Sequence, residues 1–189
     1  VISYNSTVTD LPNAVLNLET FDLKIQGVSM VALSDSQGVY IYPIDSVVVL
    51  KKNMDFKFTG KIEAGLFKFH VHDGSFDYNQ FKINLPFIDS MTFSVRDKKR
   101  DLLTGSFPLV RIRDVITRLG GELLIDDSTN KSGLKALIEY PVFINKNNSF
   151  VFWDRPSIRN GAYKKEKFYY ELQPFTLKSL DIVTTASLR

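Results

Sequence analysis

Apolar and polar residues alternate along much of the chain, most regularly between residues 56 and 95. The clearest segment is Phe56–Ala64, in which Phe, Phe, Gly, Ile and Ala alternate with Lys, Thr, Lys and Glu. A period of two places one set of side chains in a core and the other set in water, which is the pattern of a half-buried strand. The alternation therefore predicts an all-β protein.

Similar short segments, separated by Gly, Asp and Pro, recur along the chain. We expect strands over residues 21–25, 28–33, 39–42, 47–50, 56–64, 66–72, 81–85, 91–95, 109–119, 122–125, 149–153 and 168–172. Segment 109–119 also fits a short helix ended by Gly120 and Gly121, and we favour the strand. The strands start roughly every 8–12 residues, a spacing shared by sandwiches, barrels and β-solenoids.

Tight hairpin signals are few, since Asp73-Gly74 is the one good two-residue turn between confident strands. This scarcity favours a parallel β-helix or β-solenoid-like stack of short strands, in which each rung contacts its neighbours. An antiparallel β-sandwich is the alternative. We expect residues 1–189 to be a single β-rich domain or a fragment of a longer repeat array. Regular stacked strands are expected over 20–133 and a less regular C-terminal part over 134–189.

The composition narrows the function classes. A chain of 189 residues can bury a sizeable core. The net charge of +3 is small and spread along the chain, which argues against a nucleic-acid-binding domain. The charged segment 96–101 is interpreted as a solvated turn rather than a phosphate contact. No apolar run approaches the roughly 20 residues needed to span a bilayer. Cysteine is absent, which excludes disulfides and thiolate metal sites.

Two segments carry residue types that bind metals. His70 and His72 point the same way on a predicted strand, which would suit two ligands of one metal. They are the only two histidines of the chain, and Lys68 on the same face opposes a bound cation. Segment 126–130 begins like a calcium loop, but Lys131 takes the place of the glycine that such a loop needs. We therefore interpret the histidines as solvent-facing and the loop as a polar turn, and we predict no metal and no cofactor.

Candidate binding residues are cationic and aromatic. The sequence has no nucleophile elbow, phosphate loop or dinucleotide fingerprint, so no catalytic residue is assigned. Carboxylates are numerous, which leaves an acid pair for glycoside hydrolysis open. Lys57, Lys61, Lys68 and Lys82 are expected on outward faces, where they would form a cationic face suited to an acidic glycan or would protect strand edges. Trp153 is a candidate for stacking on a sugar, with a packed core Trp as the simpler interpretation.

Four parts of the chain resemble segments of very large, uncharacterised β-rich envelope proteins of Gram-negative bacteria. They are residues 33–37, 76–85, 124–126 with 130–134, and 168–175. The resemblance implies an exported or envelope-associated protein, located in the cell envelope or outside the cell. It also implies that neighbouring repeats of the same longer chain are partners of this piece. It carries over no catalytic residues.

Three hypotheses for function follow. The leading one is a non-enzymatic structural or recognition β-repeat module of a large bacterial surface or envelope protein, with glycan as its candidate ligand. The alternative is a carbohydrate-active β-helix enzyme, similar to a polysaccharide lyase or hydrolase. The third is lipid handling by an open β-groove lined with phenylalanine. A groove holding an Asp–Lys–Arg cluster would favour the enzyme, and an exposed apolar trough would favour lipid handling.

Overall fold

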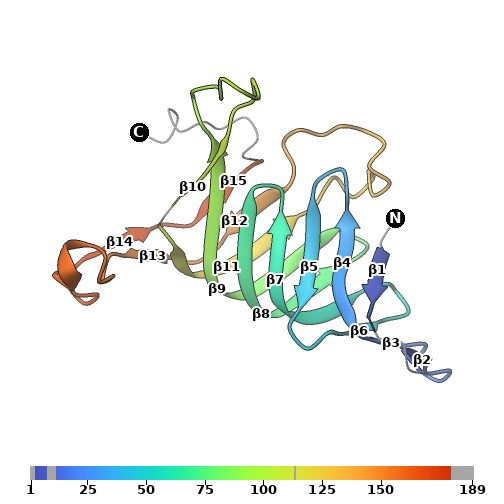
Figure 1. The fold of residues 1–189 in the computed structure, drawn as a ribbon. Helices are drawn as coiled ribbons and strands as arrows, with labels where there is room; N and C mark the ends of the chain where they lie inside the picture. Colours follow the sequence, from blue (N-terminus) through green and yellow to red (C-terminus); the bar gives the residue numbers. More distant parts are fainter. Residues whose placement is uncertain (1–2, 8–11, 113, 180–189) are drawn as a thin grey trace.

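The computed structural model describes residues 3–7, 12–112 and 114–179 (Figure 1). These residues form strands and one short 3-10 helix, which confirms the all-β prediction. The strands are β1 (Ser3–Ser6), β2 (Ala14–Leu16), β3 (Leu23–Gln26), β4 (Val28–Ser34), β5 (Val39–Pro43), β6 (Val47–Leu50), β7 (Phe56–Ala64), β8 (Phe67–Asp77), β9 (Lys82–Arg96), β10 (Leu109–Arg111), β11 (Ile116–Leu124), β12 (Val142–Asn145), β13 (Ser149–Phe152), β14 (Tyr169–Leu172) and β15 (Phe175–Leu177). The helix is Arg159–Gly161.

The strands form two sheets. The larger has twelve strands along the path β1-β4-β5-β7-β8-β9-β11-β12-β15, with β10 paired to β9 and the β13–β14 hairpin paired to β11. The smaller sheet has the order β2-β3-β6. Every pairing between described strands is antiparallel. The parallel solenoid predicted from the spacing is therefore not found in the described residues, and the antiparallel alternative agrees with the pairing.

The hairpins are made by turns that carry weaker sequence signals than Asn-Gly. β7 and β8 are joined at Gly65 and Leu66, and Gly65 has a φ of 55°. β4 and β5 are joined by residues 35–38, which end at Gly38 with a φ of 62°. Both glycines supply the left-handed conformation that a tight reversal needs. The scarcity of Asn-Gly pairs therefore does not argue against antiparallel hairpins, because these turns form without such pairs.

Two strands are longer than the sequence predicts. β8 continues through Asp73-Gly74, so the prediction of a turn at these residues is wrong. Asp73 instead has a φ of 52° inside the strand. β9 likewise runs through Pro86. The paired positions skip from His72 with Phe87 to Ser75 with Asn84, so Pro86 lies where the ladder is interrupted. Its missing N–H therefore costs no ladder hydrogen bond to β8.

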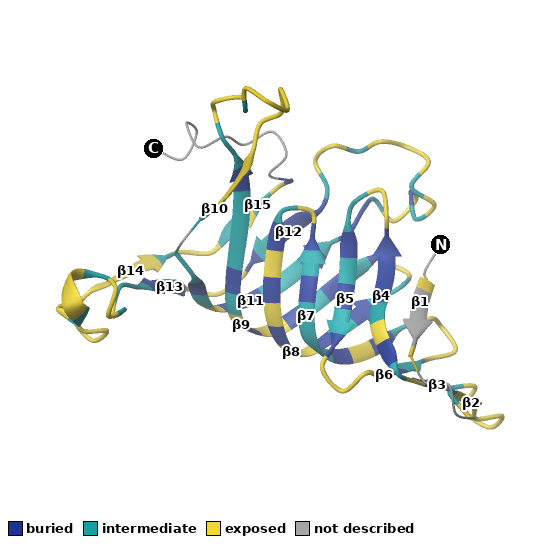
Figure 2. Ribbon diagram, viewed as in Figure 1, coloured by how far each residue is buried: buried dark blue, intermediate teal, exposed yellow. Residues whose placement is uncertain are grey.

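The core is rich in phenylalanine and lies between layers of strands. The buried phenylalanines are Phe56, Phe58, Phe67, Phe69, Phe76, Phe81 and Phe143. Ile25 of β3 and Val48 of β6 belong to the same buried cluster, so the small sheet packs on the large one. Along β8 burial alternates as predicted, with Lys68 and His70 exposed. Figure 2 shows this alternation as bands along β7, β8 and β9.

A long loop lies against the β4–β5 turn. The loop follows β11, and the Asp126 carboxylate in it is buried. That carboxylate accepts hydrogen bonds from Gln37 Nε2 at 3.1 Å and from Asn130 Nδ2 at 3.0 Å. The loop is thereby held against the β4–β5 turn. None of the described residues forms a helix that could span a membrane.

Candidate functional site

The four lysines of the predicted cationic face do not form one continuous face. The Nζ atoms of Lys61 and Lys68 both lie close to Glu63 Oε1, at 2.7 and 3.0 Å. The hydrogen bond from Lys61 is the main reason that the pKa of Glu63 is lowered. These two lysines thus share one carboxylate of their own sheet, which offsets part of their charge.

Lys82 belongs to a separate cluster. Its Nζ lies 3.2 Å from Glu122 Oε1, which Lys146 also approaches at 2.9 Å. Lys82 pairs with Asp77 at one end of β8, whereas Lys68 lies at the other end. Lys57 is exposed on β7 opposite Ser75. Lys57 and Lys68 are exposed, whereas Lys61 and Lys82 are partly buried, and the ion pairs and the distance along β8 separate the four side chains.

The residues that could hold a metal form no metal site in the described part of the chain. His70 and His72 are exposed on β8, and His72 Nε2 lies 2.9 Å from Asp89 Oδ2. No group of three or more His, Asp or Glu side chains converges among the described residues. Segment 126–130 is a polar turn in which Asn130 bonds to Lys135 through both backbone groups of that residue. The buried Asp126 carboxylate of this segment accepts from Gln37 and Asn130 and therefore has a structural role.

Trp153, the predicted sugar-stacking residue, is half-buried and packs against the core.

The residues beside Trp153 form a more open aromatic surface. The rings of Phe150 and Phe152 on β13 lie 5.9 Å apart and nearly parallel, at 15°. Tyr169 of β14 meets them at 5.7 and 6.2 Å. In Figure 1 this hairpin extends to the side of the sheets.

Two cations lie over this aromatic surface. The guanidinium of Arg118 is 5.4 Å from the Phe150 ring and 6.0 Å from the Phe152 ring. Lys165 Nζ is 4.6 Å from the Phe152 ring. We call the region formed by Arg118, Phe150, Phe152, Lys165 and Tyr169 the aromatic–cationic hollow. Within residues 3–7, 12–112 and 114–179, no ion pair to a carboxylate is found for either cation.

The hollow is open and has mixed chemistry. It consists of two adjoining depressions of about 550 and 410 Å³ that share Arg118, Phe152 and Lys165. Asp89 lines the first depression and Glu166 the second. Stacked guanidinium groups are weakly hydrated and still present their N–H groups at the edge, so they bind carboxylates and phosphates well. The arrangement can therefore hold an anionic ligand that also offers an apolar face.

An irregularity in β11 creates the hollow. β11 pairs with β13 through Ile116 and Thr117, and with β12 from Gly121 onward. At this change of partner the register on β9 also shifts, between Leu119 and Gly121. Arg118 lies at the break with a φ of 60°. A side chain in this conformation costs about 1–3 kcal/mol and persists where surrounding contacts impose it, often at binding sites.

Two features of the sequence bear on this site, the glycine pair that also fits a helix end and two phenylalanines on one strand. Gly120-Gly121 inside a strand is typical of a bulge or a close backbone approach. A Cβ on Gly120 would lie 2.7 Å from the Pro86 carbonyl oxygen, so only glycine fits. Phe150 and Phe152, two apart on a strand, share one face. Nothing in the local pattern pairs these segments with Lys165, because that contact depends on how the hairpin folds back.

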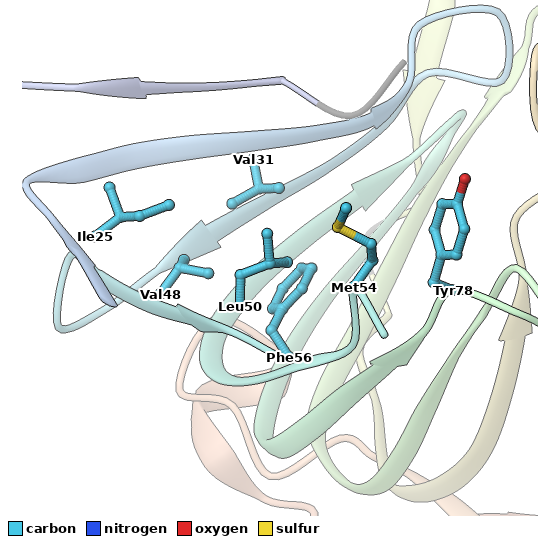
Figure 3. Close-up of a pocket in the computed structure, with 7 residues that line it drawn as sticks. All are labelled: Ile25, Val31, Val48, Leu50, Met54, Phe56 and Tyr78. Carbon is cyan, nitrogen blue, oxygen red and sulfur yellow. The ribbon is translucent and has the colours of Figure 1, made fainter. Parts of the chain in front are cut away.

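A second cavity is apolar and lies between the two sheets (Figure 3). Its volume is about 310 Å³, and its lining residues are Ile25, Val31, Val48, Leu50, Met54, Phe56 and Tyr78. Met54 is 47 % exposed, so the cavity reaches the surface. Lys131 Nζ lies 4.4 Å from the Tyr78 ring and places a cation beside the lining. The cavity is of a size that ligands occupy, at the small end of the range.

Comparison of the chain with protein-family models, with curated proteins and with solved structures finds no match.

Proposed function

We propose that this sandwich-like β domain is a non-enzymatic recognition module that binds an acidic glycan in the aromatic–cationic hollow. The observation that carries the proposal is the position of Arg118 and Lys165 over the ring of Phe152. Sugar rings present apolar C–H faces that pack on aromatic side chains, and acidic sugars add a carboxylate. Arg binds such a carboxylate through paired N–H groups, and Lys binds it as a point charge.

The module would belong to a large bacterial surface or envelope protein. This part of the proposal rests on the resemblance of residues 33–37, 76–85, 124–126 with 130–134, and 168–175 to segments of such proteins. It would lie in the cell envelope or outside the cell, where polysaccharides are abundant. Neighbouring repeats of the same longer chain would be its other partners.

Calorimetric titration with a defined oligogalacturonate, and with a neutral dextran oligosaccharide as comparison, tests the proposal. The acidic oligosaccharide is expected to bind and the neutral one to bind more weakly. Arg118→Ala and Lys165→Ala should each lower the affinity by about tenfold or more, since each removes a charge-assisted hydrogen bond. Lys68→Ala is the matched control, because that lysine already pairs with Glu63. Equal binding by wild type and both hollow variants would contradict the proposal.

A second candidate function, a carbohydrate-active enzyme, is favoured by one feature of the same hollow. Asp89, Arg118 and Lys165 line one depression, which is the kind of cluster expected for such an enzyme. In a lyase a cation neutralises the uronate carboxylate and a base removes the C5 proton. The C4–C5 double bond then forms as the C4–O glycosidic bond breaks, and the leaving oxygen takes a proton. Asp89 and His72, 2.9 Å apart, are the pair that could exchange that proton. Product formation, followed by ultraviolet absorbance of the unsaturated sugar, distinguishes this enzyme from a binding module.

A third candidate, lipid handling, is favoured by the apolar cavity between the sheets. The cavity is a partly enclosed space rather than the open groove expected from the sequence. It could hold a short aliphatic chain, with an anionic head group near Lys131. Binding of a short fatty acid, treated in the Discussion, tests this function separately from the hollow.

A further inference from the structure

The loop between β9 and β10 projects beyond both sheets (Figure 1) and is mostly exposed (Figure 2). At its tip Leu102 and Leu103 are 101 % and 97 % exposed. Single exposed leucines are ordinary on protein surfaces. Here two adjacent leucines at the end of a projecting loop are both fully exposed. They form a small apolar surface that the rest of the described chain does not cover. Contiguous exposed apolar surface of this kind, when it is large enough, is found at contacts with partners or membranes.

The tip is held in a defined shape by its own hydrogen bonds. Asp101 Oδ1 accepts from the backbone N–H groups of Leu103 and Thr104, both at 2.8 Å. Asp101 N donates to the Ser106 carbonyl at 2.8 Å, and Gly105 N donates to the Asp101 carbonyl at 2.9 Å. Backbone groups that lack partners are costly in apolar surroundings. These N–H groups already have partners, so the two leucines can leave water while the Asp101 carboxylate, whose burial would be costly, stays at the hydrated head groups.

Three cations precede the leucines. Lys98, Lys99 and Arg100 are all exposed. The Arg100 guanidinium lies 5.0 Å from the ring of Phe107 on the returning side of the loop. Asp97 and Asp101 flank these cations, so residues 96–101 hold four basic and two acidic side chains, and the loop combines an apolar tip with a moderately cationic base. This is the distribution that matches the acyl boundary and the anionic head groups of a membrane surface.

We propose that the β9–β10 loop docks on an anionic lipid bilayer, with Leu102 and Leu103 in the acyl boundary and the three cations at the lipid phosphates. A bilayer fits this tip better than a protein partner does. Stable protein interfaces bury about 800 Å² on each side with complementary shapes. A narrow convex tip of two side chains offers less area, whereas a fluid bilayer adapts to it.

Co-sedimentation of the whole chain with vesicles tests the docking. Two preparations are compared at the same salt concentration, phosphatidylcholine alone and an equimolar mixture of phosphatidylcholine and phosphatidylglycerol. The chain is expected to sediment with the anionic vesicles. Leu102→Ser with Leu103→Ser should lower the partition coefficient by at least about tenfold. Lys98→Ala and Lys99→Ala should each lower it by about fivefold on the anionic vesicles only. Leu134→Ser, at a leucine that is 88 % exposed in another loop, should change nothing.

A fluorescent probe reports insertion directly. Because the chain has no cysteine, Leu103→Cys and Leu134→Cys can each be labelled at one site with an environment-sensitive dye. Anionic vesicles should shift the emission of the dye to the blue at position 103 and leave it unchanged at 134. Absence of wild-type sedimentation with anionic vesicles would overturn the proposal, as would unchanged sedimentation of the double leucine variant. Self-association that depends on the leucines, without vesicle binding, would overturn it in favour of a protein contact. Urea unfolding at the wild-type midpoint confirms that each variant is folded.

Discussion

The side chains of Phe69 and Phe143 pack against each other, with ring centroids 4.9 Å apart and an interplanar angle of 54°. Phe69 lies on β8 and Phe143 on β12, with β9 and β11 between them in the sheet. In a flat sheet three strand spacings of about 4.8 Å would separate β8 from β12. The ring contact therefore requires the large sheet to fold back on itself and enclose the core.

Phe143→Ala is expected to lower the free energy of unfolding by about 3–5 kcal/mol, because it leaves a cavity at a fully buried position. Urea denaturation measures the change. Phe87→Ala is the matched control, since Phe87 is 64 % exposed on β9 and should change stability by about 0.5 kcal/mol or less. A double-mutant cycle with Phe69→Ala should give a coupling of about 0.5–1.5 kcal/mol. A cost for Phe143→Ala no larger than that of the control would contradict the folded-back sheet.

The class of the fold could be predicted from the sequence, but its topology could not. Alternation in Phe56–Ala64 identified which side chains are buried, since period two is a local property of a strand. Strand pairing is not local. The same spacing of strands fits a rung of a solenoid and a hairpin, and the choice depends on turns such as Gly65-Leu66. The length of β8 could not be predicted either, because an Asp-Gly pair is compatible both with a hairpin turn and with an interruption inside one continuous strand.

Gly121→Ala should strongly destabilise the protein. A Cβ on Gly121 would overlap the carbonyl oxygen of Ile144 on the paired strand β12. Both partners are backbone in a ladder, so neither can move without breaking pairing, and we expect a loss of about 2–4 kcal/mol by urea denaturation. Gly105→Ala is the control, because open space surrounds it and only its φ of 67° is unfavourable. That variant should lose about 1 kcal/mol. Similar losses for the two variants would show that β11 and β12 can separate at this point.

The ion pairs of Glu122 predict a dependence of stability on pH. Hydrogen bonding from Lys146, followed by Lys82, lowers the pKa of Glu122 below its ordinary value of 4.5. A lowered pKa in the folded state stabilises the protein above the unfolded value, and this stabilisation is lost as the pH falls below about 4.5. Glu122→Gln should therefore cost about 1 kcal/mol at neutral pH and progressively less as the pH falls from about 4.5 through the lowered pKa of the folded state.

Urea denaturation of wild type and Glu122→Gln at neutral pH and through this acidic range measures this difference. Glu19→Gln is the control, because Glu19 is exposed and no ion pair is found for it within the described ranges. Its effect should be small at every pH. A cost of Glu122→Gln that persists unchanged in acid would show that the side chain stabilises the fold by packing rather than by charge.

The candidate site was harder to predict than the fold class. Of the four lysines, Lys57 and Lys68 are exposed and Lys61 and Lys82 are partly buried, and Glu63 and Glu122 form ion pairs with three of them. An ion pair across strands depends on register, which the local sequence does not encode. The hollow around Arg118 depends further on the break in β11, where one strand serves two different partners.

The apolar cavity predicts binding of a short fatty acid. Octanoate should raise the midpoint of thermal unfolding of the wild type, since a ligand that binds only the folded state stabilises it. Val48→Phe places a ring in the cavity and should lower octanoate affinity by about tenfold, with a change in stability of no more than about 3 kcal/mol. Ile44→Phe, at a residue that is 78 % exposed, adds the same ring outside the cavity and should leave affinity unchanged. Equal affinity in both variants would exclude this cavity as the binding site.

Two substitutions of Arg118 separate the effect of its backbone conformation on stability from the effect of its side chain on binding. Arg118→Gly and Arg118→Ala both remove the guanidinium from the Phe150 and Phe152 rings. Only glycine adopts the φ of 60° without a steric penalty, so the Gly variant should be more stable than the Ala variant by about 1 kcal/mol in urea. Both variants should lose affinity for oligogalacturonate to the same extent, because binding depends on the absent side chain.

Stability in urea and affinity for oligogalacturonate together test whether the strained backbone of Arg118 serves ligand binding. If the Gly variant is more stable than the Ala variant while both lose binding, the fold bears a cost at residue 118 in order to hold the guanidinium over the aromatic rings. If the Gly variant keeps its affinity, the hollow binds through Lys165 and the rings alone. If the two variants are equally stable, Arg118 bears no strain, and its conformation is a plain consequence of the change of strand partner in β11.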